Sequence, residues 1–153
     1  MTTHATSAAA GSDVSVAQPR SFTRFIPATV RVLMGLPLVV FGLNGFLNFI
    51  PPPATPLPEG ATLFVGALFK SGYMMQLIAG TQLVAGALLL ANRFVPLALA
   101  LLAPFLVNSL AFHLVLEPSG LVMAGIFSAF ELYRAWAYRR AFLPMLAARV
   151  TPA

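Results

Sequence analysis

Residues 94–116 read FVPLALALLAPFLVNSLAFHLVL and contain no charged side chain. At a rise of ~1.5 Å per residue, a helix of this length crosses a hydrocarbon core of ~30 Å. The second half of the stretch carries Asn108, Ser109 and His113, which membrane insertion does not require and which are unfavourable in lipid. We therefore expect residues 94–116 to form a membrane-spanning helix that also carries the functional groups of the chain.

The composition agrees with this interpretation. Of the 153 residues, 59% are hydrophobic and only 8% are charged, against ~25% charged in a typical soluble domain. The net charge of +5 comes from basic residues beside apolar runs, which is typical of cytoplasmic flanks and argues against a nucleic-acid partner. The chain has no cysteine, which excludes disulfide exchange and thiolate ligation of metals or Fe–S clusters.

Four apolar segments are long enough to be spans: residues 30–50, 73–91, 94–116 and 121–138. The run of prolines at 51–53 ends the first of them, because proline lacks an N–H and disfavours helix in the preceding residue. Residues 61–69 are too few to cross, so we expect a short helix at the interface or re-entering the bundle. The predicted fold is all-α: a polytopic membrane four-helix bundle with a short extra extracytoplasmic or re-entrant helix.

The distribution of basic residues predicts the orientation. Eight arginines fall on one side of the four-span arrangement: Arg20, Arg24, Arg31, Arg93, Arg134, Arg139, Arg140 and Arg149. Only Lys70 falls on the other side. Because cytoplasmic loops are enriched in Lys and Arg, we expect a multi-pass protein of the bacterial inner membrane with both termini cytoplasmic. Residues 1–24 are expected to be a disordered cytoplasmic tail, 25–142 the membrane domain, and 143–153 a cytoplasmic C-terminal tail.

Small residues repeat at helical spacing in the first two spans. Gly35 and Gly42 are seven residues apart and lie on one stripe of the first span. In the second span, Ala79, Gln82 and Gly86 share a face. Small residues on such stripes let two helices approach closely in a membrane, so we expect these faces to meet other helices.

Most of the polar groups inside the spans lie in the outer half. Asn44, Gln82, Asn108 and His113 are at similar depth there, with Ser109 beside them. We expect these five to line one outward-opening pocket, in which His113 is the group that titrates near neutral pH. Two plainer interpretations stay open: the amides hydrogen-bond across helices and do nothing else, or His113 is simply solvated at the interface.

A separate pair lies near the inner end of the last span. Glu131 and Arg134 are one turn apart, which favours a buried ion pair. The chain shows no His pair at metal-ligand spacing, no carboxylate pair and no Gly-rich phosphate loop. We therefore expect no metal site, and any chemistry would come from a bound cofactor such as a quinone.

Several stretches together resemble the DoxX family of membrane proteins. They are residues 31–48 (RVLMGLPLVVFGLNGFLN), 80–93 (GTQLVAGALLLANR) and 104–113 (PFLVNSLAFH), with Glu131-Leu132-Tyr133 and Trp136 near the end. The resemblance covers residues 25–142 and implies a four-helix membrane bundle. Some relatives are similar to membrane subunits of thiosulfate:quinone oxidoreductases, others are partners of redox enzymes, and most have no assigned activity. Because the chain has no cysteine, it lacks the residue that any thiol-based role of such relatives would require.

These observations lead to three functional hypotheses. The first is an accessory, non-catalytic membrane subunit of a redox system that binds a quinone-like molecule in the polar pocket. Its partners would be the lipid bilayer and either another redox subunit or further copies of itself. The second is a small transporter or channel-like protein that uses the same polar groups as a path, and the third is a membrane scaffold without a ligand.

Overall fold

All regular secondary structure in the described residues, 26–52 and 54–148, of the computed structural model is helical. The elements are α1 (Ile26–Leu47), α2 (Glu59–Lys70), α3 (Met74–Leu90), α4 (Val95–Val115), η2 (Pro118–Gly120), α5 (Leu121–Ala137), α6 (Arg139–Phe142) and η3 (Leu143–Leu146). The tail expected at residues 1–24 lies outside the described residues, as do residues 149–153 of the expected C-terminal tail.

Two helices, α1 and α4, are long and apolar enough to cross a membrane. A third candidate is the pair formed by α2 and α3, which are bent by 89° at the break between them. The short helix expected between the first two spans is therefore present as α2, and it turns sharply into α3. The prediction of an all-α chain with membrane-length apolar helices is confirmed.

The end of α1 shows how polar side chains terminate these helices. Asn48 adopts a left-handed backbone conformation with φ of 50°, which asparagine tolerates better than most residues. The side chain of Asn44 accepts a hydrogen bond from the Ile50 N–H at 2.7 Å. The first helix therefore ends at Leu47, three residues before the expected boundary, because an asparagine turn and not the proline run ends it.

The helices α1 and α3 pack in opposite directions along a seam of small residues. A Cβ added at Gly42 would lie 2.7 Å from the Leu83 backbone nitrogen, and one at Gly86 would lie 2.9 Å from the Gly35 carbonyl oxygen. Gly45, further along α1, meets Ala79. The prediction that the small-residue faces make close helix contacts is confirmed, and we call this contact the glycine seam.

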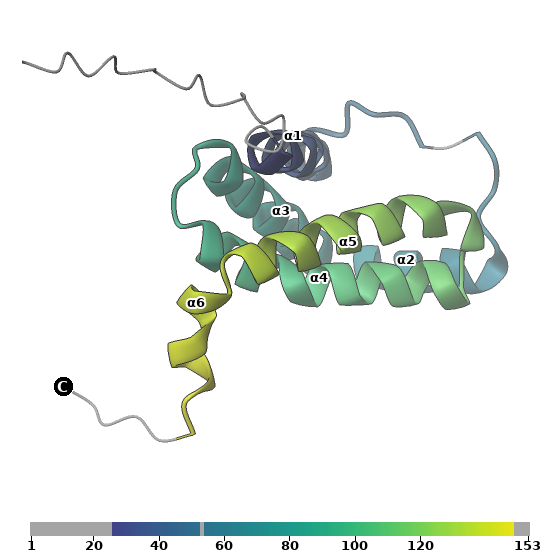
Figure 1. The fold of residues 1–153 in the computed structure, drawn as a ribbon. Coiled ribbons are helices and arrows are strands. Elements are labelled where there is room, and N and C mark those ends of the chain that lie inside the picture. Colours follow the sequence, from purple (N-terminus) through teal and green to yellow (C-terminus); the bar gives the residue numbers. More distant parts are fainter. Residues whose placement is uncertain (1–25, 53, 149–153) are drawn as a thin grey trace, which may run out of the picture.

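A second antiparallel arrangement joins α4 to α5 through the short turn at η2, and α4 also packs against α3. Figure 1 shows α4 and α5 side by side, with α3 and α1 beyond them and α2 behind α4. The largest fully buried side chains lie where these helices meet, at Met34, Leu89, Leu99 and Leu102. The helices α6 and η3 extend away from this core (Figure 1).

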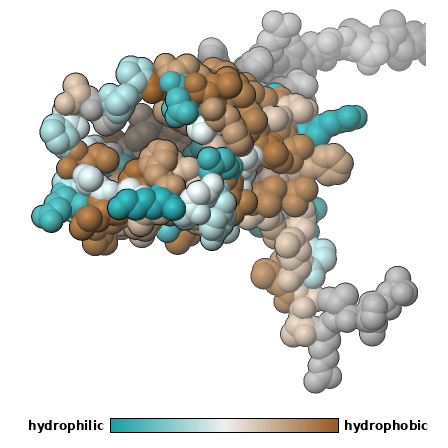
Figure 2. Space-filling model, turned by 180° about the vertical axis from the view of Figure 1, so that it is seen from behind, coloured by the Kyte–Doolittle hydropathy of each residue, from teal (hydrophilic) through white to brown (hydrophobic). Residues whose placement is uncertain are grey.

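Apolar side chains also cover the outside of the helices. Exposed large residues include Leu63, Val107, Val115, Val122 and Leu132, each at least 67% accessible. Figure 2 shows the corresponding hydrophobic colour over much of the helical body. Soluble monomers rarely expose apolar patches of this extent, so the surface suits contact with lipid chains.

Candidate ligand cavity

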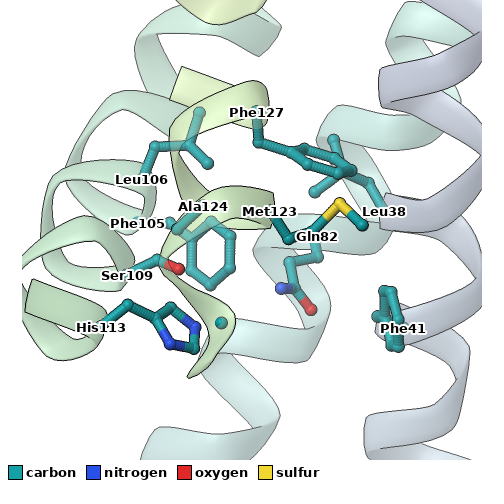
Figure 3. Close-up of a pocket in the computed structure, with 11 residues that line it drawn as sticks. Leu38, Phe41, Gln82, Phe105, Leu106, Ser109, His113, Met123, Ala124 and Phe127 are labelled. Carbon is teal, nitrogen blue, oxygen red and sulfur yellow. The ribbon is translucent and has the colours of Figure 1, made fainter. Parts of the chain in front are cut away.

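A cavity of about 310 Å³ lies between α1, α3, α4 and α5, toward the end of the molecule that carries η2. Its wall is formed by Leu38, Phe41, Gln82, Phe105, Leu106, Ser109, His113, Gly120, Met123, Ala124 and Phe127 (Figure 3). Most of these side chains are apolar or aromatic. Binding sites for small organic molecules have this character: a largely apolar wall of this size with a few polar groups that fix orientation.

Three polar side chains face this apolar wall. Figure 3 shows the Gln82 amide and the His113 ring directed toward the space between them, with Ser109 on the same side as His113. Within the part of the chain that the structure describes, neither the Gln82 amide nor the Ser109 hydroxyl has a hydrogen-bond partner. Both groups are therefore available to a ligand.

His113 is held by the turn that follows its own helix. Its Nδ1 lies 2.9 Å from the Glu117 carbonyl oxygen and 2.8 Å from Glu117 Oε2. The Glu117 carboxylate in turn accepts from the Ser119 hydroxyl and, at 3.1 Å, from the Gly120 N–H. The ring of Phe112 meets the imidazole edge-on at 5.1 Å. The imidazole is thus fixed in place from two sides.

The turn keeps the Glu117 carboxyl ionised. The hydrogen bond from Ser119 is the largest cause that lowers the pKa of Glu117 below its usual value of 4.5, helped by those from Gly120 and His113. Partial desolvation opposes them, but the net shift is downward. A carboxylate stabilised by several donors stays charged at any physiological pH, so His113 has a permanent anionic partner.

The structure brings together three of the five residues expected in one pocket, Gln82, Ser109 and His113. Asn44 does not line this cavity, because its side chain closes the end of α1. Asn108 lies on another face of α4, in a separate hollow of about 380 Å³ between α2, α3 and α4. One step along a helix rotates a side chain by ~100°, so equal depth did not bring Asn108 to the same cavity as Ser109.

In the described residues, Glu131 and Arg134 do not form the expected ion pair. Both side chains are buried, at 8% and 2% accessibility, but no contact within 4.0 Å joins them in the described residues. Arg134 instead donates from Nη1 to the Pro27 carbonyl oxygen at 2.8 Å and lies over the Tyr138 ring. This bond ties the start of α1 to α5, at the end of the molecule opposite the cavity.

Sequence reasoning missed two kinds of site residue. The first kind is the aromatic and thioether side chains of the cavity wall. Their sequence pattern does not distinguish them from ordinary lipid-facing or core residues. They are Phe41, Phe105, Met123 and Phe127. The second is Glu117, which did carry a sequence signal, because it follows His113 by four residues and such residues are neighbours on a helix surface. In the described residues, no group of three or more His, Cys, Asp or Glu side chains is placed to hold a metal ion.

Comparison with known proteins adds no relative to this picture. No protein-family model, no curated protein and no solved structure matches the chain.

Proposed function

We propose that the protein crosses the membrane four times, through α1, α3, α4 and α5, as an inner-membrane protein. The helices α3 and α5 have 17 residues each, which is within the range of known spans. The start of α1, the turn at Arg93 and the end of α5 would face the cytoplasm, which puts the arginines there and the cavity in the outer half. The apolar exterior supports this arrangement (Figure 2).

Cysteine labelling tests this topology, since the chain has no native cysteine. In intact cells, an impermeant maleimide should react with Thr55→Cys, in the loop before α2, and should miss Ala91→Cys, at the end of α3. Both positions are exposed in the structure. The reverse pattern would invert the orientation, and labelling of both would remove α3 as a span.

The function that the geometry supports best is binding of a quinone-like ring molecule in the cavity. The observation that carries this proposal is an apolar, aromatic-lined cavity into which three polar side chains from α3 and α4 project. A flat ring would contact Phe41 and Phe105, while its oxygen substituents would lie near Gln82 and His113, and the Gln82 amide would donate to one of them. The entry of such a molecule from the bilayer requires no soluble domain.

The link to a redox system comes from the resemblance to DoxX proteins. On that resemblance we propose an accessory subunit that binds the cofactor for a partner enzyme. Association with another redox subunit, or with further copies of the chain, belongs to the same proposal.

Binding of a short-chain benzoquinone to the purified protein in lipid nanodiscs tests the cavity. Gln82→Leu should weaken binding about tenfold, the effect of one lost hydrogen bond of ~1–1.5 kcal/mol. Gln76→Leu is the matched control, since Gln76 lies on α3 but outside this cavity. Asn108→Leu should also leave binding unchanged. Equal binding by wild type and Gln82→Leu would exclude this site, and solute flux through liposomes without quinone binding would favour a transporter.

A further inference from the structure

The hydrogen-bond partners of His113 determine which ring nitrogen carries a proton. Nδ1 faces the Glu117 carbonyl oxygen at 2.9 Å and the Glu117 carboxylate at 2.8 Å. Both groups can only accept hydrogen bonds while the carboxyl is ionised. Nδ1 must therefore donate, and a neutral His113 has its proton on Nδ1 and a lone pair on Nε2.

The surrounding turn prevents the ring from turning over to exchange these roles. Gly120 lies directly against the imidazole, so that the three atoms nearest to a Cβ added there would all be imidazole atoms. Glu117 is only 8% accessible, and its carboxylate is itself anchored by Ser119 and the Gly120 N–H. Because both the ring and its partner are fixed, the direction of the hydrogen bond is built into the turn.

Because Nδ1 carries the proton, the other ring nitrogen, Nε2, has a free lone pair in the neutral imidazole. Within the described part of the chain this nitrogen has no protein partner, and His113 lines the cavity. Gln82 and Ser109 can each donate or accept a hydrogen bond, so they fit either a hydroxyl or a carbonyl. Neutral Nε2 can only accept, so this atom decides which ligands are favoured.

We propose that the cavity selects ligands with an aromatic hydroxyl group, such as phenols and the reduced, quinol form of a quinone, and that Glu117 is the positioning residue for this selection. This inference rests on the proposed binding of a ring molecule and specifies its chemical class. The ligand hydroxyl would donate to His113 Nε2 while the ring lies against the apolar wall.

Nitrogen NMR of the ligand-free protein tests the first step. In nanodiscs at pH 8, ¹⁵N-labelled His113 should show a protonated Nδ1 and an unprotonated Nε2. The other histidine, His4, is removed by His4→Gln to assign the signal. Glu117→Gln should raise the share of the form protonated on Nε2, because its amide can also donate to Nδ1, although the backbone carbonyl of residue 117 still accepts from Nδ1. Glu59→Gln, on an exposed acid of α2, should change nothing. A protonated Nε2 in the neutral wild-type ring would overturn the proposal.

Ligand selection is tested with an alkylphenol and its methyl ether, in which a methyl group replaces the hydroxyl proton, and neither compound undergoes a redox change in the assay. At pH 8 the phenol should bind about tenfold more tightly than the ether, the effect of one hydrogen bond. The ratio should fall to near one in His113→Leu and should decrease in Glu117→Gln, with Glu59→Gln as the control.

The outcomes separate the two proposals. Equal binding of phenol and ether to wild type, together with benzoquinone binding that needs Gln82, would overturn the hydroxyl selection and leave the proposed function in place. Failure of phenol, ether and benzoquinone alike to bind would overturn both. A hydroxyl preference that survives unchanged in Glu117→Gln would remove Glu117 from its positioning role.

Discussion

The glycine seam between α1 and α3 and the cavity between the helix pairs are both interior surfaces, but they are built from side chains of opposite size. In the seam, Gly42 and Gly86 bring the backbones so close that an added Cβ would lie 2.7 to 2.9 Å from a backbone atom of the neighbouring helix, and one at Gly35 would lie 2.9 Å from the Leu90 side chain. In the cavity, large side chains such as Phe41 and Phe127 hold the helices apart and leave about 310 Å³ open.

This difference suits the glycine seam to stabilise the fold and the cavity to bind a ligand. Close contact at the seam maximises van der Waals packing, on which helix association in lipid depends because the hydrophobic effect is absent there. The side chains that line the open volume of the cavity lack van der Waals contacts on that side. An interior region that gives up packing and also presents unpartnered polar groups is better suited to hold a ligand than to hold the fold together.

The most damaging change should be Gly42→Leu in the seam. The new Cβ alone would lie 2.7 Å from the Leu83 backbone nitrogen, so α1 and α3 must separate. We expect a loss of about 3 kcal/mol in the free energy of unfolding, at the upper end of overpacking effects. Thermal unfolding in mild detergent measures it.

Gly125→Leu on α5 is the matched control, because nothing lies within 4 Å of a Cβ added there. It should be neutral or slightly stabilising, since glycine is a poor helix former. Equal melting temperatures for Gly42→Leu and Gly125→Leu would show that α1 and α3 do not make this close contact in the purified protein.

A smaller loss should follow from Asn44→Ala at the edge of the seam. This change removes the acceptor for the Ile50 N–H, and one such bond contributes about 1 kcal/mol. Quinone binding should not change, because Asn44 does not line the cavity. A variant of unchanged stability with weakened binding would instead place Asn44 in the site.

The cavity should tolerate what the seam cannot. Ala124→Leu adds volume to a residue of the cavity wall, and filling a cavity stabilises proteins by about 0.5–2 kcal/mol when the shape fits. We expect a stability change of less than about 1 kcal/mol, together with loss of benzoquinone and phenol binding in nanodiscs. Strong destabilisation by Ala124→Leu would mean that the purified protein has no open cavity beside residue 124.

The smallest effect should be the pH dependence due to Glu117. Because the folded-state pKa of Glu117 lies below 4.5, this carboxylate favours the folded state above that pH, and its contribution is lost as the pH falls through the lowered value. The melting temperature of wild type should exceed that of Glu117→Gln at pH 6, and the gap should narrow at pH 3.5. A gap that widens in acid would contradict the assigned charge.

The boundaries of the helices could be predicted from the sequence to within a few residues. Residues 94–116 were expected to form one helix, and α4 covers Val95–Val115. The largest error was at the first helix, expected at 30–50 and found at Ile26–Leu47. The end of α1 differs because the Asn44 bond that closes it forms only after the chain has turned.

The candidate site could be predicted only in part, because sequence spacing gives depth in the membrane and not direction. Of the residues grouped by depth, Gln82, Ser109 and His113 line one cavity in the structure. Depth also selected Asn108, which points into a different hollow. Direction depends on which helices become neighbours, and that is decided by contacts such as Gly42 against Leu83, which are far apart along the chain.

The sequence alone therefore determined that the chain is helical, apolar enough for a membrane and close-packed along the stripe of Gly35 and Gly42, because these properties follow from composition and local periodicity. The tertiary structure decided that aromatic side chains enclose a cavity and that the turn of Glu117 and Gly120 fixes the imidazole of His113. The volume of a cavity and the free nitrogen of a ring arise only when separate helices meet, since each depends on atoms that no single segment contains.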